Sequence, residues 1–459
     1  MSKFVRADGR VIYTQTSLTK QQKEAIGLLS IGTFLEYFDL MLYVHMAVLL
    51  NELFFPKYDP HTTSLLSAIA FCSTFVARPV GALLFGWIGD NIGRKSTVII
   101  TTSMMAISCI VMANLPTYAQ IGVTAAWLVT ICRIVQGISS MGEVIGAELY
   151  VTEITKPPVQ YPAVSLIGIS SSLGGMFALA IAYLVTRNGF NWRIAFWVGA
   201  GIALVGVVAR TNLRETPEFV DAKRYLKRIL DNVSNKVSID KKHVESNPIY
   251  NEKANPKTLL LLFLMNCIWP ICFYFLYIYC GNILKNSFGY SAEQIIHQNF
   301  TVSIIQLLGI CLLAYLSYII YPIKILKVTT SVFFIFILFL PYLLDNIRTP
   351  FDLFLIQSFI VLFVSYAPIA AITYKHFPVF KRFTSVSLIF ALSRALMYVI
   401  TSFGAVYLVE YLGNWGLLII LLPTTIGFIV GLYHFEKLEK EAGNYPQKSD
   451  IDYVGRTVV

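Results

Sequence analysis

Apolar runs as long as a lipid bilayer is thick recur along the whole chain. A helix needs about 20 apolar residues to cross the roughly 30 Å of hydrocarbon in a bilayer. Short segments with charged residues, Pro or Gly separate the runs, of which we place twelve. Of the 459 residues, 56% are hydrophobic and only 14% are charged, which is more apolar surface than a soluble core of this size buries. We therefore predict a protein that crosses a membrane many times.

The runs are uninterrupted stretches of Leu, Ile and Phe, without the alternating polarity of barrel strands, so they predict helices. One long polar stretch divides them into two sets of six, and we predict an all-α polytopic fold of twelve transmembrane helices. The expected helices cover 25–50, 62–88, 95–113, 121–144, 163–186, 192–211, 258–282, 299–320, 325–344, 351–374, 383–409 and 414–434. The expected parts are an N-terminal arm at 1–24, a first half at 25–211, a linker at 212–257, a second half at 258–434 and a tail at 435–459.

Lys and Arg in the short polar segments predict the orientation, because cytoplasmic loops retain them. The arm carries Lys3, Arg6, Arg10, Lys20 and Lys23, and alternate loops after it are also basic. We therefore expect the arm, the linker and the tail, and so both termini, in the cytoplasm. The net charge of +10 fits this topology and contact with anionic lipid. No basic soluble domain is present that would predict a nucleic-acid partner.

The loop after the second predicted helix contains a motif, Gly86-Trp87-Ile88-Gly89-Asp90-Asn91-Ile92-Gly93-Arg94-Lys95. It resembles the GxxxDxxGRR/K signature of the major facilitator superfamily. Four further segments, EYFD at 36–39, ARPVG at 77–81, QGISSMGE at 136–143 and LRETPEF at 213–219, resemble its metabolite/proton symporters, most closely the bacterial proline/betaine transporters. In the second half Tyr318 stands where that superfamily often repeats the signature Asp.

The resemblance implies a transporter of two six-helix halves in a bacterial inner membrane, with protons and a small molecule as its partners. It implies no cofactor, and we expect a monomer. Asp90 at a helix end is placed to pair with arginines and with a neighbouring helix terminus. We predict that this loop latches one conformation, through Gly86, Gly89, Asp90, Gly93, Arg94 and Lys95.

Ionisable residues inside the first two predicted helices are the leading candidates for chemistry. Glu36 and Asp39 lie one turn apart near the middle of the first helix, and Arg78 lies at a similar depth in the second. Such groups are costly in a membrane and mark ion or proton paths. We predict that Glu36 and Asp39 exchange a proton with Arg78 as their charge partner, and that Glu143 in the fourth helix contributes. A permanent structural ion pair is the alternative.

Candidate substrate residues lie in both halves. Arg133 and Arg394 fall near mid-helix and could bind a carboxylate. Tyr43 lies on the same helix face as Asp39, and Trp269, Tyr274 and Tyr277 surround Pro270. Aromatic rings can hold a quaternary ammonium group by cation–π attraction, although aromatic residues are also common in membrane helices. We predict that these residues contact the substrate.

From this pattern we expect a proton-coupled importer of a small zwitterionic or carboxylate metabolite. The sequence does not choose among proline, betaine, ectoine, 2-oxoglutarate, citrate and shikimate-like ligands. A facilitator or antiporter of a small organic acid with the same fold is the alternative, and a nutrient receptor that transports nothing is a third. There is no GxxxxGKS/T loop for ATP, and no constellation of Ser, His and Asp or of metal ligands, so we expect neither an ATP-driven pump nor an enzyme.

Overall fold

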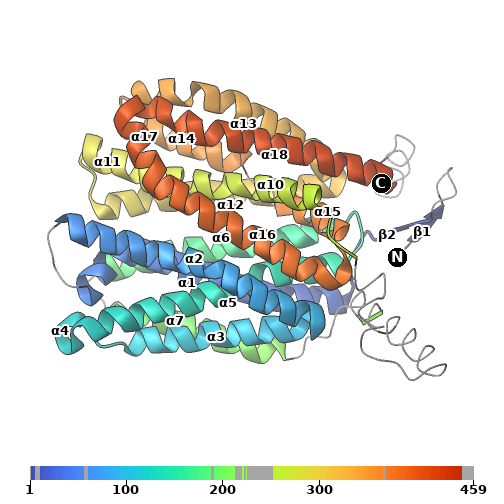
Figure 1. Ribbon diagram of the computed structural model, residues 1–459, viewed down its shortest axis with the longest axis horizontal. Helices are drawn as coiled ribbons and strands as arrows, with labels where there is room; N and C mark the ends of the chain where they lie inside the picture. The colour runs from blue at the N-terminus through green and yellow to red at the C-terminus, as the bar shows by residue number, and fades with distance from the viewer. Residues whose placement is uncertain are drawn as a thin grey trace.

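The computed structural model describes residues 2–5, 11–55, 60–187, 191–211, 220–221, 224, 252–364 and 367–446. Within these ranges many side chains, including those of residues 60–73 and of Glu143, lie outside the described residues. Long helices form two sets that lie side by side along one direction (Figure 1). The first set runs from blue to green in that view and the second from yellow to red. The predicted linker at 212–257 falls almost entirely outside the described residues.

In the described residues of the first half there are seven helices, of which α4 is a single turn. Their bounds are α1 Lys20–Phe54, α2 Pro60–Asn91, α3 Arg94–Asn114, α4 Tyr118–Ile121, α5 Val123–Ile154, α6 Gln160–Arg187 and α7 Arg193–Arg210. α1 begins earlier than expected, inside the predicted arm. The arm also holds two short antiparallel strands, β1 Ser2–Val5 and β2 Val11–Thr14, which we did not predict. Val11, Ile12 and Tyr13 favour an extended backbone.

The second half is less regular, because several of its helices contain π or 3-10 turns. Its elements are α10 Pro256–Tyr274, η1 Phe275–Tyr279, α11 Cys280–Phe288, α12 Ala292–Ile319, α13 Pro322–Asp345, α14 Pro350–Phe363, η2 Ala367–Ile369, α15 Ala370–Thr373, η3 Tyr374–His376, α16 Val379–Val399, η4 Ile400–Gly404, α17 Ala405–Leu412, η5 Gly413–Trp415 and α18 Gly416–Glu441. The helix α18 continues into the segment predicted as the tail.

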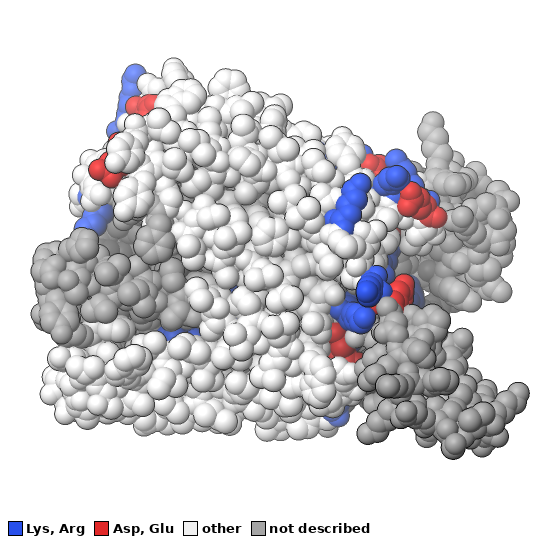
Figure 2. Space-filling model, in the orientation of Figure 1, with Lys and Arg blue, Asp and Glu red and all other residues white. Residues whose placement is uncertain are grey.

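The helices are long and apolar enough to cross a bilayer. Nine helical stretches in the described part meet that criterion by length and composition, and α7 and α14 contribute shorter apolar helices. α2 has 32 residues, which is also sufficient. On the face shown in Figure 2, most charged side chains lie near the two ends of the molecule and leave a wide uncharged belt between them. The predicted multi-pass helical fold is therefore confirmed.

Two pairs of helices carry most of the contact between the halves: α2 lies along α16, and α6 lies along α12. Within the first half α1 packs along α6 and α2 along α5. The start of α1 and the end of α18 lie at the same end of the bundle, which we call the terminal end (Figure 1). The space between these helix pairs is where a ligand could reach both halves.

A widened turn interrupts the helix that follows Pro270. Proline cannot donate a backbone hydrogen bond inside a helix, and here the α-helical pattern gives way to π-helix η1 five residues later. A second π-helix, η4, follows Arg394 in α16. π turns of this kind often occur at functional sites. Both interrupted helices contribute to the cavity described next.

Candidate functional site

A cavity of about 160 Å³ lies between the two halves. The first half contributes α1, α5 and α6 to its wall, and the second half contributes α10, η1, α12, α16, α18 and the irregular segment from η2 to η3. Most of its lining is apolar or aromatic. The polar side chains in the lining include Tyr37, His45, Glu148, Ser171, Ser172, Asn266, Tyr277, Ser303, Gln306, Thr373, Tyr374 and Arg394. We call this space the central cavity.

Three of the predicted substrate residues line the central cavity: Arg394, Trp269 and Tyr277. Arg394 is only 5% exposed, and its guanidinium carbon lies 3.2 Å from the centre of the Phe390 ring. The Tyr277 hydroxyl lies 3.2 Å from the Ser303 Oγ and donates to Gln306 Oε1 at 3.3 Å. The cavity thus has one cationic group on the α16 wall and a hydrogen-bonded aromatic wall at η1.

The other predicted substrate residues, Arg133, Tyr43 and Tyr274, do not line the central cavity in this conformation. Arg133 and Tyr43 are buried together, with the guanidinium carbon 4.0 Å from the centre of the tyrosine ring. Tyr274 packs against a hydrophobic core cluster to which both halves contribute. Their positions along the predicted helices placed these residues near the middle of the membrane. The rotation of each helix about its axis, however, directs their side chains away from the central cavity.

A second, much smaller cavity of about 10 Å³ brings four charged residues together: Glu36, Asp39, Arg78 and Arg133. We call these residues the charged cluster, and all four are at most 3% exposed. Arg133 Nη1 lies 4.0 Å from Asp39 Oδ2, and the Cys109 Sγ donates to Asp39 Oδ1 at 3.5 Å. Helix α1 borders both cavities, because Tyr37 and Met41 face the central one while Glu36 and Asp39 face the cluster.

The ion-pair partner of Asp39 is therefore Arg133, whereas the sequence predicts that Arg78 pairs with Asp39 or Glu36. In the described part of the chain Arg78 forms no ion pair with Asp39, but it borders the same small cavity and is close enough to Glu36 for their charges to interact. Its guanidinium lies over the Phe75 ring at 4.9 Å. Arg133 also donates to Gln136 Oε1 at 2.7 Å, one turn along α5. The side chain of Glu143 lies outside the described residues.

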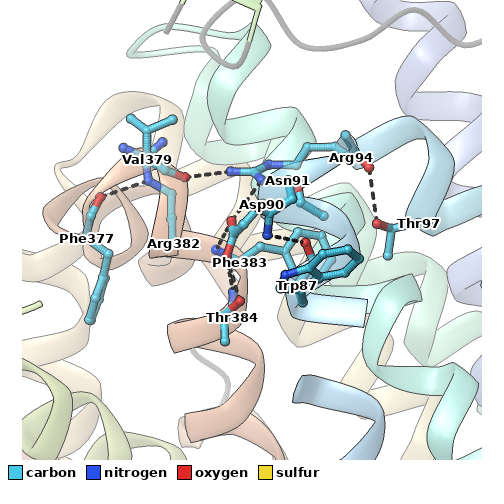
Figure 3. A network of polar contacts seen from close by, with 12 residues as sticks. Trp87, Asp90, Asn91, Arg94, Thr97, Phe377, Val379, Arg382, Phe383 and Thr384 are labelled. Atoms are coloured by element: carbon cyan, nitrogen blue, oxygen red, sulfur yellow. Dashed lines mark hydrogen bonds and ion pairs between the residues drawn. The ribbon is translucent and has the colours of Figure 1, made fainter. Parts of the chain in front are cut away.

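A buried polar network joins the halves at the terminal end (Figure 3). Asp90, at the end of α2, accepts hydrogen bonds from the Phe383 N–H at 3.1 Å, the Thr384 N–H at 2.8 Å and the Thr384 hydroxyl at 2.7 Å, all from the first turns of α16. Arg94 bonds to Asp90 at 2.9 Å and to the Val379 carbonyl at 3.0 Å. We call this set of contacts the interhalf network.

Glu153, at the end of α5, extends the interhalf network. Its Oε1 accepts from Arg382 at 3.2 Å and from Arg94 at 3.5 Å, so one carboxylate contacts arginines of both halves. A side chain at Gly86 or Gly89 would collide with Thr384 or Phe383, and Gly93 has a φ of 150°, which favours glycine. Lys95 instead donates to the Thr211 carbonyl at the surface. The motif residues thus form a close junction between α2 and α16.

The second half has a carboxylate cluster of its own where the repeated signature is missing. Glu439, fully buried near the end of α18, accepts from the Tyr321 hydroxyl at 2.7 Å and lies 2.8 Å from Lys375 Nζ and 2.7 Å from His376 Nε2. Glu436 pairs with Lys327 at 2.6 Å. These contacts fix the start of α13 and η3 to α18. Although Tyr318 replaces the signature Asp, Glu436 and Glu439 still provide polar contacts at this end of the second half.

Neither Glu148 nor Tyr374 is among the predicted site residues, although the depth of Glu148 in its helix made it a lesser candidate for the proton path. Both line the central cavity, and the Tyr374 hydroxyl donates to Glu148 Oε2 at 2.7 Å across the two halves. An acidic residue inside an apolar helix was a usable signal for Glu148. Tyr374 gave no such signal, since its position depends on the irregular segment from η2 to η3.

These helices, the cavity between two halves and the junction at one end define a known class of membrane protein. A sequence profile of the Major Facilitator Superfamily matches residues 29–402. The chain belongs to that superfamily, as its motifs predicted.

Known proteins similar to this chain give more detail. An inner membrane metabolite transport protein of Escherichia coli, YhjE, is 34% identical over 47% of this chain and 50% of its own length. A proline/betaine transporter of Salmonella typhimurium is 33% identical over 43% of this chain and 41% of its length. The matched region spans about half the length of these relatives or less. The resemblance to proline/betaine transporters is thereby confirmed.

Solved structures with the same fold are more distant in sequence. The proton:xylose symporter XylE bound to 6-bromo-6-deoxy-D-glucose has a TM-score of 0.72 at 16% identity, over 91% of this chain and 95% of that one. The human organic anion transporter MFSD10 has a TM-score of 0.65 at 15% identity, over 90% of this chain and 99% of that one. At these identities the likeness establishes the fold alone.

Proposed function

We propose that this protein is a proton-coupled symporter that imports a small zwitterionic or carboxylate metabolite by alternating access. A proline- or betaine-like solute is the favoured substrate. The observation that carries the proposal is that α1 borders both a central cavity with a buried guanidinium and a cluster with a buried, loosely paired carboxylate. Movement of α1 could therefore link substrate binding to proton binding.

The size and lining of the central cavity support a small substrate. An apolar cavity of about 150 Å³ in a soluble protein holds benzene, so a cavity of about 160 Å³ suits a ligand of similarly few heavy atoms. Arg394 would bind a carboxylate, and Trp269, Phe273 and Tyr277 offer ring faces for a quaternary or secondary ammonium group. The names of the proline/betaine relatives support the same substrate class.

The charged cluster supports the proton-coupling role. Asp39 Oδ2 accepts no hydrogen bond from the described residues, and its ion-pair partner is 4.0 Å away. A buried membrane carboxylate held this loosely is suited to gain and lose a proton. We propose that Asp39 carries the proton against Arg133, that Glu36 and Arg78 form the second acidic and basic positions, and that Glu143 contributes to the path.

The interhalf network supports a gating role for the motif loop. Three donors of α16 converge on Asp90, and Glu153 bridges two arginines in a buried site. We propose that this network closes the cytoplasmic side of the cavity and breaks when the cavity opens inward. In this proposal the terminal end faces the cytoplasm.

Uptake into proteoliposomes tests the proposal. The purified full chain is reconstituted, the inside is made alkaline, and radiolabelled proline or glycine betaine is supplied outside. We expect accumulation above the external concentration, and its loss when a protonophore collapses the gradient. Uptake that reaches only the external concentration, with counterflow unaffected by the gradient, would instead indicate a facilitator or an exchanger.

A further inference from the structure

Glu148 has no part in the proposed proton path, yet it occupies a distinctive place. It lies on α5 of the first half and lines the central cavity, and its Oε2 accepts the Tyr374 hydroxyl at 2.7 Å from the second half. The rest of its helix turn is apolar or small, with Val144, Ile145 and Ala147 buried. A carboxylate that borders a ligand-sized cavity invites the question of which ligand group it contacts.

The described lining of the central cavity is balanced in charge. Its titratable side chains are Tyr37, His45, Glu148, Tyr277, Tyr374 and Arg394. Among these described lining residues, Glu148 carries the carboxylate and Arg394 carries the guanidinium. The two residues belong to opposite halves. They form no direct ion pair in the described structure, although they are close enough for their charges to interact. Each can therefore still take an oppositely charged group of a ligand.

Building on the proposed import of a small zwitterion or carboxylate, we propose that Glu148 is the residue that selects zwitterions. It binds the cationic group of the substrate while Arg394 binds the carboxylate. An anion of the same shape would bring no cation to Glu148 and would leave two negative groups near each other in a buried site. Such an unmatched charge is the usual means by which a site rejects a close analogue.

The contact with Tyr374 adds a structural consequence. An ionised carboxylate has two acceptor oxygens and room for several donors, so Glu148 can keep the Tyr374 bond on Oε2 and accept a substrate ammonium on Oε1. The bound zwitterion would then touch α5 of the first half and α16 of the second half at once. Binding would draw the two cavity walls together around the ligand.

Two probes of the same shape separate charge from size: L-proline and tetrahydrofuran-2-carboxylate, in which an uncharged ring oxygen replaces the ammonium. We expect the purified wild-type protein to bind proline at least tenfold more tightly in a competition assay, equivalent to about 1.4 kcal/mol. Glu148→Gln keeps the size and the acceptor for Tyr374 but removes the charge, and should reduce this preference at least tenfold, chiefly by weakening proline binding.

The matched control is Glu293→Gln. Glu293 also accepts a tyrosine hydroxyl across the halves, from Tyr183 at 3.2 Å, but it is exposed and outside the cavity. This variant should keep the wild-type preference. Tyr374→Phe removes the hydrogen bond and leaves the charge of Glu148, so it should also prefer proline.

Each outcome decides the matter. If wild type binds proline and Glu148→Gln retains the full preference, the role of Glu148 is wrong and the proposed import function stands. If the wild-type protein binds proline and tetrahydrofuran-2-carboxylate equally, the selection of zwitterions is overturned. If it binds neither proline nor glycine betaine, both the selection of zwitterions and the favoured substrate class are overturned. If Tyr374→Phe and Glu148→Gln lose the preference for proline equally, the hydrogen bond between Tyr374 and Glu148, and not the charge of Glu148, sets that preference. If Glu148→Gln fails to fold, equal binding of the two probes by the wild-type protein still overturns the proposal.

Discussion

Two acids and two arginines meet around one cavity of about 10 Å³ in the charged cluster. Isolated charges in a membrane protein interior are costly, but equal numbers of each sign, close together, offset most of that cost. The Asp39 and Arg133 pair at 4.0 Å is looser than a bidentate ion pair, whose bonds are about 2.7 to 2.9 Å. At the scale of single residues, this looseness is what suits the pair to a change of protonation.

Replacing Asp39 with Asn should abolish concentrative uptake and spare exchange. The variant cannot release a proton at this position, while the cavity that would bind substrate keeps its lining. We expect accumulation under a pH gradient to fall to the external concentration, with counterflow within about threefold of wild type, the energy equivalent of less than 1 kcal/mol. Asp221→Asn, which alters a highly exposed carboxylate, is the control. Full accumulation by Asp39→Asn would remove Asp39 from the proton path.

The sequence revealed which residues were unusual but not which of them would meet. Charges inside apolar runs marked Glu36, Asp39, Arg78, Arg133 and Arg394, and all five are buried. Pairing depends on how each helix is rotated about its axis, and the mixed polarity of these helices does not fix that rotation. This is why Arg133 rather than Arg78 pairs with Asp39, and why only Arg394 of the two candidate anchors reaches the central cavity.

Among the elements, glycines set how closely helices approach within the first half. A Cβ on Gly174 of α6 would overlap the Phe34 carbonyl of α1, and one on Gly137 of α5 would overlap the Thr74 carbonyl of α2. Both neighbours are backbone atoms, which cannot move as a side chain can. Close backbone approach through small residues is the usual basis of helix packing in membranes. These two glycines therefore set the spacing of α1 from α6 and of α2 from α5.

Gly174→Ala should destabilise the protein, because α1 and α6 would have to separate. Overpacking of this kind costs about 1 to 3 kcal/mol, more than the about 1 kcal/mol that Ala gains over Gly in a helix. Thermal unfolding of the detergent-purified protein measures the effect. Gly201→Ala is the matched control, since a Cβ there meets nothing within 4 Å, and it should keep or raise the melting temperature. Equal melting temperatures for the two variants would contradict the packing account.

Glu439→Gln should loosen the end of α18. The substitution weakens contacts to Lys375 and His376 and leaves the buried Tyr321 hydroxyl with a poorer acceptor. Burial raises the pKa of the Tyr321 phenol, so it stays a donor at neutral pH. Losing charged hydrogen bonds in a buried site costs about 1 to 3 kcal/mol. Glu441→Gln, two residues on and 59% exposed, should change stability by less than about 0.5 kcal/mol. A melting temperature for Glu439→Gln equal to that of the control would refute this.

Most helix bounds followed from the apolar runs to within about five residues, although α5 runs well past its predicted end at 144, to Ile154. The irregular segments did not follow from the sequence. The π turns at η1 and η4 and the break from η2 to η3 arise inside long apolar stretches. Pro270 precedes η1 and Pro368 lies in η2, but a proline does not specify which kind of turn forms around it. Glu439 could not be expected as a contact for Tyr321 either, because 118 residues separate the two in sequence.

In the molecule as a whole, the interface between the two halves contains the open central cavity and, at the terminal end, the contacts of the interhalf network. The network lies where α2 meets α16 (Figure 3), and its charged side chains are at most 6% exposed. A two-state protein moves between conformations when a contact made in one of them is weakened. We propose that the interhalf network is such a contact.

Asp90→Asn should shift the protein toward conformations open at the terminal end. The amide provides one uncharged acceptor where the carboxylate binds three donors of α16 and also Arg94. Spin labels at Lys23 in the first half and Lys437 in the second, with the exposed Cys311 replaced by Ser, would report the separation by pulsed electron resonance. We expect a longer distance to gain at least several-fold in population, consistent with a weakening of about 1 to 3 kcal/mol. An unchanged distribution would mean that the network is not the closure.

Two halves and their motif loop were evident from the sequence, because composition, the linker and the Gly86–Lys95 motif are local features. The opposition of the halves was not, since contacts such as Asp90 with Thr384 join residues 294 apart in the chain. A shared cavity is a property of both halves together, and single-helix patterns do not specify it.

Proton movement that accompanies substrate entry tests the central claim most directly. Proteoliposomes with a trapped pH dye and no imposed gradient receive external proline or glycine betaine. Wild-type protein should acidify the interior as substrate enters, and Asp39→Asn should not. Substrate entry into wild-type vesicles without any change in internal pH would contradict proton-coupled import.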